Sequence, residues 1–118
     1  MHALRLAIAI AFTAPLIAGA AANEGSARTF EHNLQPGGMA ETCFRLEAGK
    51  SRAFEWTSDA ALDFNIHYHV GDQATYPVRL GNQTKGKGKF TARIGEEYCW
   101  MWTAKFPTRL TGRIEAED

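Results

Sequence analysis

The sequence has little cysteine, no net charge and no long apolar run after its first residues, and each shortage excludes a class of protein. Its 118 residues hold two cysteines, and 13 basic side chains balance 13 acidic ones. Such a balance gives no field that would attract nucleic acid or an anionic membrane. Beyond residue 22, no stretch approaches the roughly 20 apolar residues that cross a bilayer as a helix. We therefore expect neither a nucleic-acid-binding protein nor a membrane anchor after that point.

Residues 1–22 predict a secretory signal peptide. Arg5 precedes an apolar run over residues 6–17 and a small-residue stretch over residues 18–22. A basic residue, a short apolar core and an A-x-A pattern are what signal peptidase requires. A membrane anchor fits less well, because the apolar run is short and contains Pro15. We expect cleavage before Asn23, with cleavage two residues earlier as the alternative, and export to the periplasm or the medium of a bacterium.

The two cysteines predict a disulfide. Cys43 and Cys99 both lie in the mature chain. An isolated pair in an oxidising compartment is most simply a bridge, whereas two thiols alone are too few for a structural zinc site. Closing a loop of this length stabilises a small domain by about 4 kcal/mol on the chain-entropy model.

The remaining chain predicts an all-β fold. Residues 23–39 are rich in Gly, Ser, Asn and Glu and indicate a flexible lead-in, with room for one short edge strand. After it, short runs dense in β-branched and aromatic residues each end at Gly, Asp, Asn or Pro. Without a helical period, these runs predict that residues 40–118 form one antiparallel β-sandwich of about seven to eight short strands with one disulfide. The runs are 42–46, 52–56, 62–70, 77–80, 89–94, 98–103 and 110–116.

Alternation within two of these runs assigns their faces. Successive strand side chains point to opposite sides, so the apolar members of residues 62–70 share one face. The other face carries a polar row that we expect to meet solvent or a partner. The core set predicted in this way is Leu62, Phe64, Ile66, Tyr68, Val70, Tyr98, Trp100 and Trp102, joined by Phe54 and Trp56, and the polar row is Asp63, Asn65, His67 and His69. The lysine- and glycine-rich stretch 85–89 predicts a solvated loop.

Several of these features together suggest a family. The order of Cys43-Phe44, a turn at Gly49, the run Leu62-Asp63-Phe64-Asn65-Ile66, and Tyr98-Cys99 at the start of an aromatic strand resembles the GOLD (Golgi dynamics) domain over residues 43–115. The resemblance implies a β-sandwich that mediates protein–protein contacts and carries a disulfide between its first and penultimate strands. The family places its second cysteine three residues after the tyrosine, whereas Cys99 follows Tyr98 directly. In the family, this domain is the lumenal module of cargo receptors of the early secretory pathway. Their membrane anchor and coiled coil have no counterpart here, so their trafficking role is not implied.

His67 and His69 are the sharpest candidates for chemistry. Two imidazoles two residues apart on a strand project from one face, with Cα atoms about 6.6 Å apart, so both can reach one metal ion. Met101 would add a thioether if its strand lies alongside, and His with thioether favours copper over calcium or magnesium. The plain alternative is that both histidines decorate an exposed strand.

The sequence offers little for catalysis. It has no G-x-S-x-G, no zincin helix and no glycine-rich phosphate loop, and a bridged cysteine is no nucleophile. We therefore expect a non-enzymatic, exported binding or interaction module with an unidentified protein or small-ligand partner. Asp63 and Asn65 are the candidate partner-facing residues, and a periplasmic copper-binding protein is the alternative.

Overall fold

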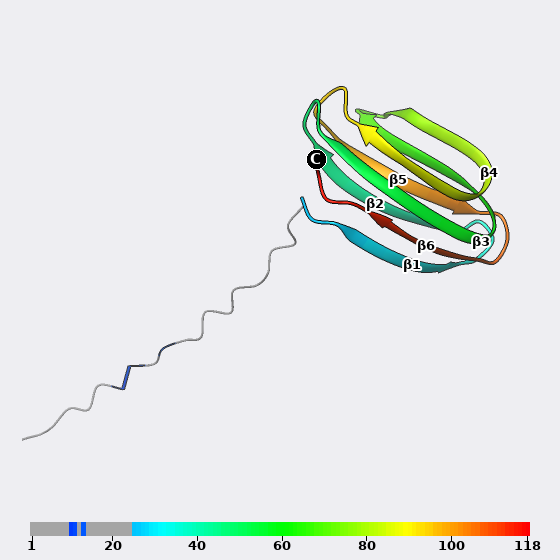
Figure 1. Ribbon diagram of the computed structural model, residues 1–118, viewed down its shortest axis with the longest axis horizontal. Helices are drawn as coiled ribbons and strands as arrows, with labels where there is room; N and C mark the ends of the chain where they lie inside the picture. The colour runs from blue at the N-terminus through cyan, green and yellow to red at the C-terminus, as the bar shows by residue number, and fades with distance from the viewer. Residues whose placement is uncertain (1–9, 12, 14–24) are drawn as a thin grey trace, which may run out of the picture.

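Six strands form one strongly curled antiparallel sheet (Figure 1). The computed structural model describes residues 10, 11, 13 and 25–118, so nearly all of the predicted signal peptide lies outside the described residues. Within the described part there is no helix long and apolar enough to span a membrane. The strands are β1 (Arg28–Leu34), β2 (Met39–Leu46), β3 (Ser51–Val70), β4 (Gln73–Thr91), β5 (Glu96–Ala104) and β6 (Thr108–Ile114).

The long strand β3 organises the sheet, because three other strands pair with it. β4 follows one edge of β3, whereas β6 pairs with residues 54–58 and β5 with residues 62–67 along the other edge. β1 extends the sheet beyond β6, and β2 extends it beyond β5. The sheet therefore curls into a half-barrel whose concave side encloses a single core (Figure 1).

The predicted all-β, antiparallel character is confirmed, but the strand count is lower and the arrangement is a curled sheet. Two pairs of predicted short strands are continuous: β3 spans both 52–56 and 62–70, and β4 spans 77–80 and the first half of 89–94. Ser58 and Asp59 lie between these two predicted runs. In the structure they belong to β3, where its pairing with β4 shifts register; Ser58 Oγ donates to the Ala60 carbonyl and Asp59 Oδ1 accepts from the Arg109 amide.

Residues 28–34, inside the expected lead-in, form strand β1. All seven residues of β1 pair with β6, so this segment is an edge of the sheet. Its inward side chains include Phe30, which packs on the core, and buried Leu34. The intervening polar residues lowered the apolar content of the segment, and this masked its alternation in the sequence.

The core is aromatic, and the predicted strand faces are largely confirmed. Phe64, Ile66, Trp100 and Trp102 are all buried in one cluster, with Tyr68 packed against it. Val70 is an exception, since it is 56% exposed where the end of β3 runs beyond the core.

The stretch 85–89 is part of β4 and not a loop. Its lysines point outward, and Lys87 lies 4.0 Å from Glu55. Its glycines point inward, where Gly86 pairs with Trp56 and Gly88 with Phe54. A Cβ at Gly86 would lie 2.7 Å from Trp56 Cε2, so glycine leaves the room that the indole occupies.

Gly86→Ala is expected to lower the free energy of unfolding by about 1–3 kcal/mol, because fully buried Trp56 cannot move aside. Urea unfolding measures the change. Gly88→Ala is the matched control, since its Cβ would meet Phe54 Cζ at 3.2 Å and need only a small shift. Equal losses in the two variants would contradict the argument.

Candidate functional site on the outer face

The outer face of β2, β5, β3 and β4 brings the predicted site residues into two adjacent rows. Strand register defines these rows, because directly paired residues project to the same side. The first row is Cys43, Cys99 and His67, and the second is Glu41, Met101, Asn65 and Arg79.

The predicted disulfide is present. Cys43 and Cys99 are direct cross-strand partners on β2 and β5, with Cα atoms 4.0 Å apart. The bridge links strands 56 residues apart in sequence, and no free cysteine remains in the described chain. It ties edge strand β2 to the centre of the sheet.

His67 belongs to the predicted polar row but is buried, with only 4% of its surface exposed. It pairs with Cys99, and its ring lies 5.0 Å from that of His69 and 5.7 Å from that of Tyr76. The expectation of an exposed His67 was therefore wrong, because neighbours from β2, β4 and β5 cover the ring. His69 is exposed, whereas Asp63 and Asn65 are half-buried.

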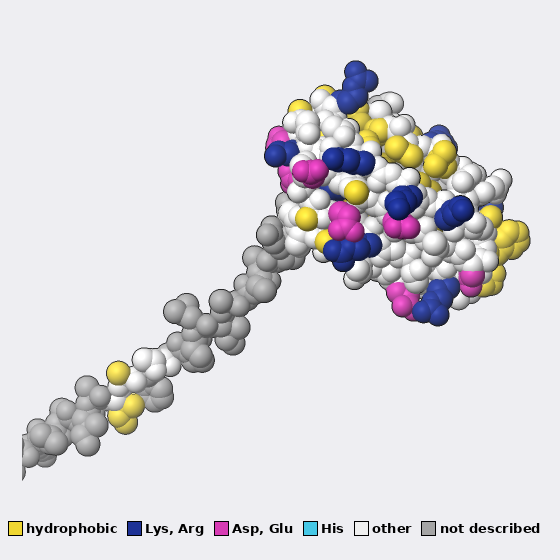
Figure 2. Space-filling model, in the orientation of Figure 1, with side chains coloured by type: hydrophobic (Ala, Val, Ile, Leu, Met, Phe, Trp, Pro, Cys, Tyr) yellow, Lys and Arg dark blue, Asp and Glu magenta, His cyan; other side chains and the backbone are white. Residues whose placement is uncertain are grey.

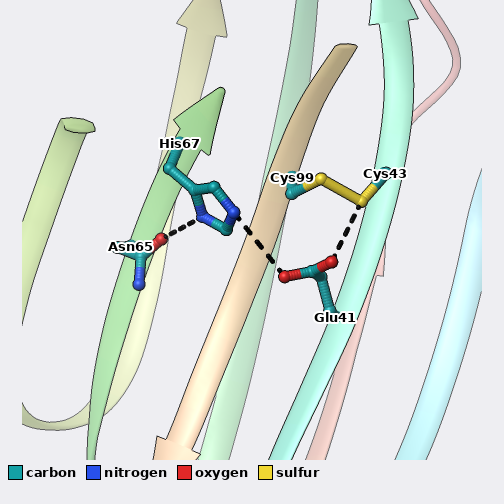
Figure 3. Close-up of a disulfide and its surroundings, with 5 residues drawn as sticks. All are labelled: Glu41, Cys43, Asn65, His67 and Cys99. Carbon is teal, nitrogen blue, oxygen red and sulfur yellow. Dashed lines mark hydrogen bonds and ion pairs between the residues drawn. A yellow bond between two sulfur atoms is a disulfide. The ribbon is translucent and has the colours of Figure 1, made fainter. Parts of the chain in front are cut away.

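Two polar side chains hold the His67 ring from opposite sides (Figure 3). Nδ1 lies 2.7 Å from Asn65 Oδ1, and Nε2 lies 3.6 Å from Glu41 Oε2. With Nδ1–H donating to Asn65, the Nε2 lone pair faces the carboxylate. Burial lowers the pKa of His67, opposed by the charge of Glu41 and reinforced by His69, so the neutral ring prevails at neutral pH.

The lowered pKa of His67 predicts that the folded protein becomes less stable as the pH is lowered. Above about 6.5 the ring is neutral in both folded and unfolded chains. As the pH falls below that value, the unfolded chain takes up a proton that the folded chain resists, so the folded state loses stability until the folded pKa is passed. Urea midpoints at about pH 7.5 and about pH 5.5 measure this.

His67→Gln should reduce the decrease in urea midpoint between the higher and the lower pH. His69→Gln, at the exposed neighbouring histidine, should leave most of that decrease in place. An undiminished fall in the His67 variant would assign the effect to other groups.

Met101 does not pair with His67. On β5, Met101 pairs with Asn65 of β3 on one side and with Glu41 of β2 on the other. It is therefore a diagonal neighbour of His67. Cα atoms in such a relation are about 7–8 Å apart. The polar neighbour that directly faces His67 Nε2 is Glu41, which the sequence analysis did not select.

A groove of about 300 Å³ lies beside the histidine, between β3, β4 and β5. Asp63, Asn65 and Met101 line it, together with Tyr76 and Arg79 from β4. The Arg79 guanidinium lies 4.8 Å from the centre of the Tyr76 ring. Asp63 is already engaged, because Oδ1 accepts from the Asn82 amide and lies 3.5 Å from Lys105 Nζ.

Exposed apolar side chains lie in this groove and next to one of its strands. Tyr76 and Leu80, in its wall, are 41% and 47% exposed. Met39, which pairs with Thr103 of the groove, is 57% exposed. Phe106, which follows Lys105 in the sequence, is 60% exposed. In contrast, Figure 2 shows cationic and anionic side chains interspersed over β3 and β6, with no block of one sign.

A second hollow of about 460 Å³ has mainly apolar walls that include Tyr68, Phe90 and Tyr98. Burial raises the pKa of Tyr98, whose hydroxyl donates to the Ile94 carbonyl. The sequence analysis placed Tyr68 and Tyr98 in the core and did not anticipate this hollow. Its polar lining is exposed Arg93 and two exposed threonines, which select no particular occupant.

Sequence reasoning also missed Glu41, Tyr76 and Arg79. Glu41 lies far from His67 in sequence and reaches it only through β5. Tyr76 and Arg79 are on β4, whose pairing with β3 contains register shifts that no sequence pattern announces. The predicted strand 77–80 contains Arg79 but stops short of Tyr76, and nothing in its pattern marked either residue as part of a site.

No protein-family model and no curated protein sequence matches this chain. Several solved structures resemble it. A pre-peptidase C-terminal domain of a Bacillus anthracis collagenase has a TM-score of 0.56 at 15% identity, covering 80% of this chain and 90% of that one.

The Aeromonas hydrophila protein PliG, a periplasmic inhibitor of g-type lysozyme, has a TM-score of 0.54 at 12% identity, covering 77% of this chain and 88% of PliG. The Yersinia pseudotuberculosis-derived mitogen has a TM-score of 0.53 at 14% identity, covering 78% and 86%. The protein therefore shares its fold with small all-β domains of bacterial proteins.

Proposed function

We propose that the protein is an exported, non-catalytic binding module that recognises a partner protein through the groove beside His67. The observation that carries this proposal is the exposed Tyr76–Arg79 pair, set in a polar groove with exposed apolar side chains in it and next to it. Tyr and Arg are the residue types that most often dominate protein–protein binding energy. The resemblance to the GOLD domain agrees with this role, although no protein-family model matches this chain.

The groove favours a partner that presents a carboxylate next to an apolar side chain. Asn65 Oδ1 is taken by His67, so the Asn65 amide can offer its N–H groups to the groove. Arg79 adds a bidentate donor, while Lys105 offsets the charge of Asp63. Leu80 and Tyr76 provide the apolar contact.

Titration with short peptides that pair Glu or Asp with Leu or Phe, followed by NMR, tests this recognition. Binding should shift the Asn65 side-chain amide signals and be lost in Arg79→Glu. Arg109→Glu is the matched control, because this exposed arginine lies outside the groove. Equal binding of the Gln and Asn versions of the peptides, or shifts confined to other faces, would overturn the proposal.

A g-type lysozyme is the first whole protein to test, because the Aeromonas hydrophila neighbour inhibits that enzyme. Inhibition by the wild type that Arg79→Glu abolishes would assign a lysozyme-inhibitor role to the groove. Inhibition unchanged in Arg79→Glu would place that contact elsewhere and count against the groove.

The exported location rests on the signal-peptide pattern of residues 1–22, the disulfide and the periplasmic neighbour. Mass spectrometry of the protein recovered from the exported fraction should give a mature chain that begins at Asn23. An intact Met1 end in that fraction would contradict cleavage.

Copper binding by His67, His69 and Met101 is the second candidate function. It is favoured by the 5.0 Å between the two imidazole centroids and by the lowered pKa of His67, since a neutral ring is needed for ligation. Affinity should decrease as the pH falls through roughly 6.5. Titration of the non-reduced protein with Cu(I) and Cu(II) tests it, and wild-type affinity in the His67→Ala, His69→Ala double variant would exclude this set. Met101→Leu tests the thioether.

A further inference from the structure

We propose that reduction of the Cys43–Cys99 bridge creates a four-ligand Zn²⁺ site made of both thiolates, His67 and Glu41. These side chains come from three adjacent strands and lie together on the outer face (Figure 3). Glu41, His67 and Cys99 form one compact group, and Cys43 adjoins it through its bridge to Cys99 and its contact with Glu41. The site differs from the copper set, because it needs neither His69 nor Met101. It also requires no partner in the groove, so it can stand or fall independently of the binding-module proposal.

The contacts that Glu41 makes with His67 and Cys43 already lie near the separations of a tetrahedral zinc site, whereas the two bridged sulfurs must move apart after reduction. Zinc bonds of 2.0–2.3 Å place neighbouring ligands about 3.3–3.8 Å apart. Glu41 Oε2 is 3.6 Å from His67 Nε2, and Glu41 Oε1 is 3.4 Å from Cys43 Sγ. That sulfur contact is not a hydrogen bond, since a bridged sulfur carries no proton. The ligand atoms of Glu41, His67 and Cys99 all lie within 4.8 Å of one another.

Asn65 prepares the histidine for this role. A metal-bound imidazole almost always donates its other ring N–H to an oxygen, which fixes the tautomer and the orientation of the ring. His67 Nδ1 lies 2.7 Å from Asn65 Oδ1, and Nε2 is on the side of Glu41 and the sulfurs. The ring is buried, so its direction is set before any ion arrives.

The chemistry balances with a phosphine as reductant. Phosphorus gives two electrons to the disulfide and becomes a phosphine oxide, taking its oxygen from water. The two protons of that water end on the two thiols. Zn²⁺ then displaces both thiol protons and binds the thiolates. The metal and the disulfide compete for the same two sulfurs, so a two-electron oxidant such as a small-molecule disulfide, which is itself reduced to two thiols as the bridge re-forms, expels the metal.

Titration of the full mature protein with Zn²⁺, with and without phosphine, tests the site. We expect one equivalent bound by the reduced protein and at least about 100-fold weaker binding by the oxidised protein. Co²⁺ in place of Zn²⁺ should give the intense visible bands of tetrahedral cobalt and a near-ultraviolet thiolate-to-cobalt band. Absence of the thiolate band would overturn the proposal.

His67→Ala should weaken zinc binding at least about 100-fold, because losing a ligand costs more than the 10–100-fold lost with a supporting partner. Asn65→Ala, which removes that partner, should cost about 10–100-fold. His69→Ala is the matched control and should bind like wild type. Zinc affinity unchanged in His67→Ala would overturn the site, because the two thiolates alone, even in an unfolded chain, would then account for the binding.

If reduction unfolds the domain, near-ultraviolet circular dichroism reports the site through the buried tryptophans. Zinc that restores the native signal in wild type but not in His67→Ala supports the proposal. Zinc that restores neither contradicts it.

Discussion

Arg52→Ala is expected to lower the free energy of unfolding by about 3–5 kcal/mol, a large share of what a small domain possesses. The guanidinium is fully buried, 3.7 Å from the centre of the Phe44 ring. Nη1 donates to the Ser26 and Glu115 carbonyls at 3.0 and 2.9 Å, so one side chain holds the segment before β1 and the segment after β6 against the sheet. Urea unfolding gives the magnitude.

Hydrogen exchange should identify the cause of that loss. In Arg52→Ala, amides near Ser26 and Glu115 should lose protection before those of β5, because their anchor is gone. Arg45→Ala is the control: Arg45 is exposed and pairs only with nearby Glu47, so its change should stay within about 0.5 kcal/mol. An Arg52→Ala protein as stable as wild type would show that the cation contributes nothing net.

Phe64→Ala is expected to cost about 3–5 kcal/mol, because it empties the centre of the aromatic core. Phe64 is 1% exposed, and its ring centroid lies 5.4 Å from those of Trp56 and Trp102 and 5.6 Å from that of Phe54. Such ring pairs add to the loss of buried area. Thermal and urea unfolding measure the change.

Val70→Ala, on the same predicted face but at the exposed end of β3, should change stability by less than about 0.5 kcal/mol. The pair of variants separates strand periodicity from actual burial. A cost below about 1 kcal/mol for Phe64→Ala would mean that the core collapses onto the cavity.

Strand periodicity carried most of what could be predicted about the core. Alternation put Phe64, Ile66, Trp100 and Trp102 on one side, and all four are buried. Arg52 has the same parity as Phe54 and Trp56 but was not part of the predicted core set, and it is fully buried. Arg52 is inside because it packs on Phe44 and donates to the backbone carbonyls of Ser26 and Glu115, and no local sequence pattern indicates these distant contacts.

The candidate site, too, was predictable from the sequence only in part. His67 and Asn65 share a face by local alternation, and an isolated cysteine pair in an exported chain predicts its own bridge. Glu41, Tyr76 and Arg79 join them only through the pairing of β2 with β5 and of β3 with β4. Burial of His67 has the same origin, because covering side chains come from three other strands.

The sequence by itself determined the all-β class, the disulfide partners and the side of the strand to which each residue points, because all three depend on composition or on a two-residue period. The tertiary structure decided which strands lie side by side, and hence where a buried cation, a covered histidine and a groove occur. Those features depend on register between distant segments, which is fixed by how the whole aromatic core packs.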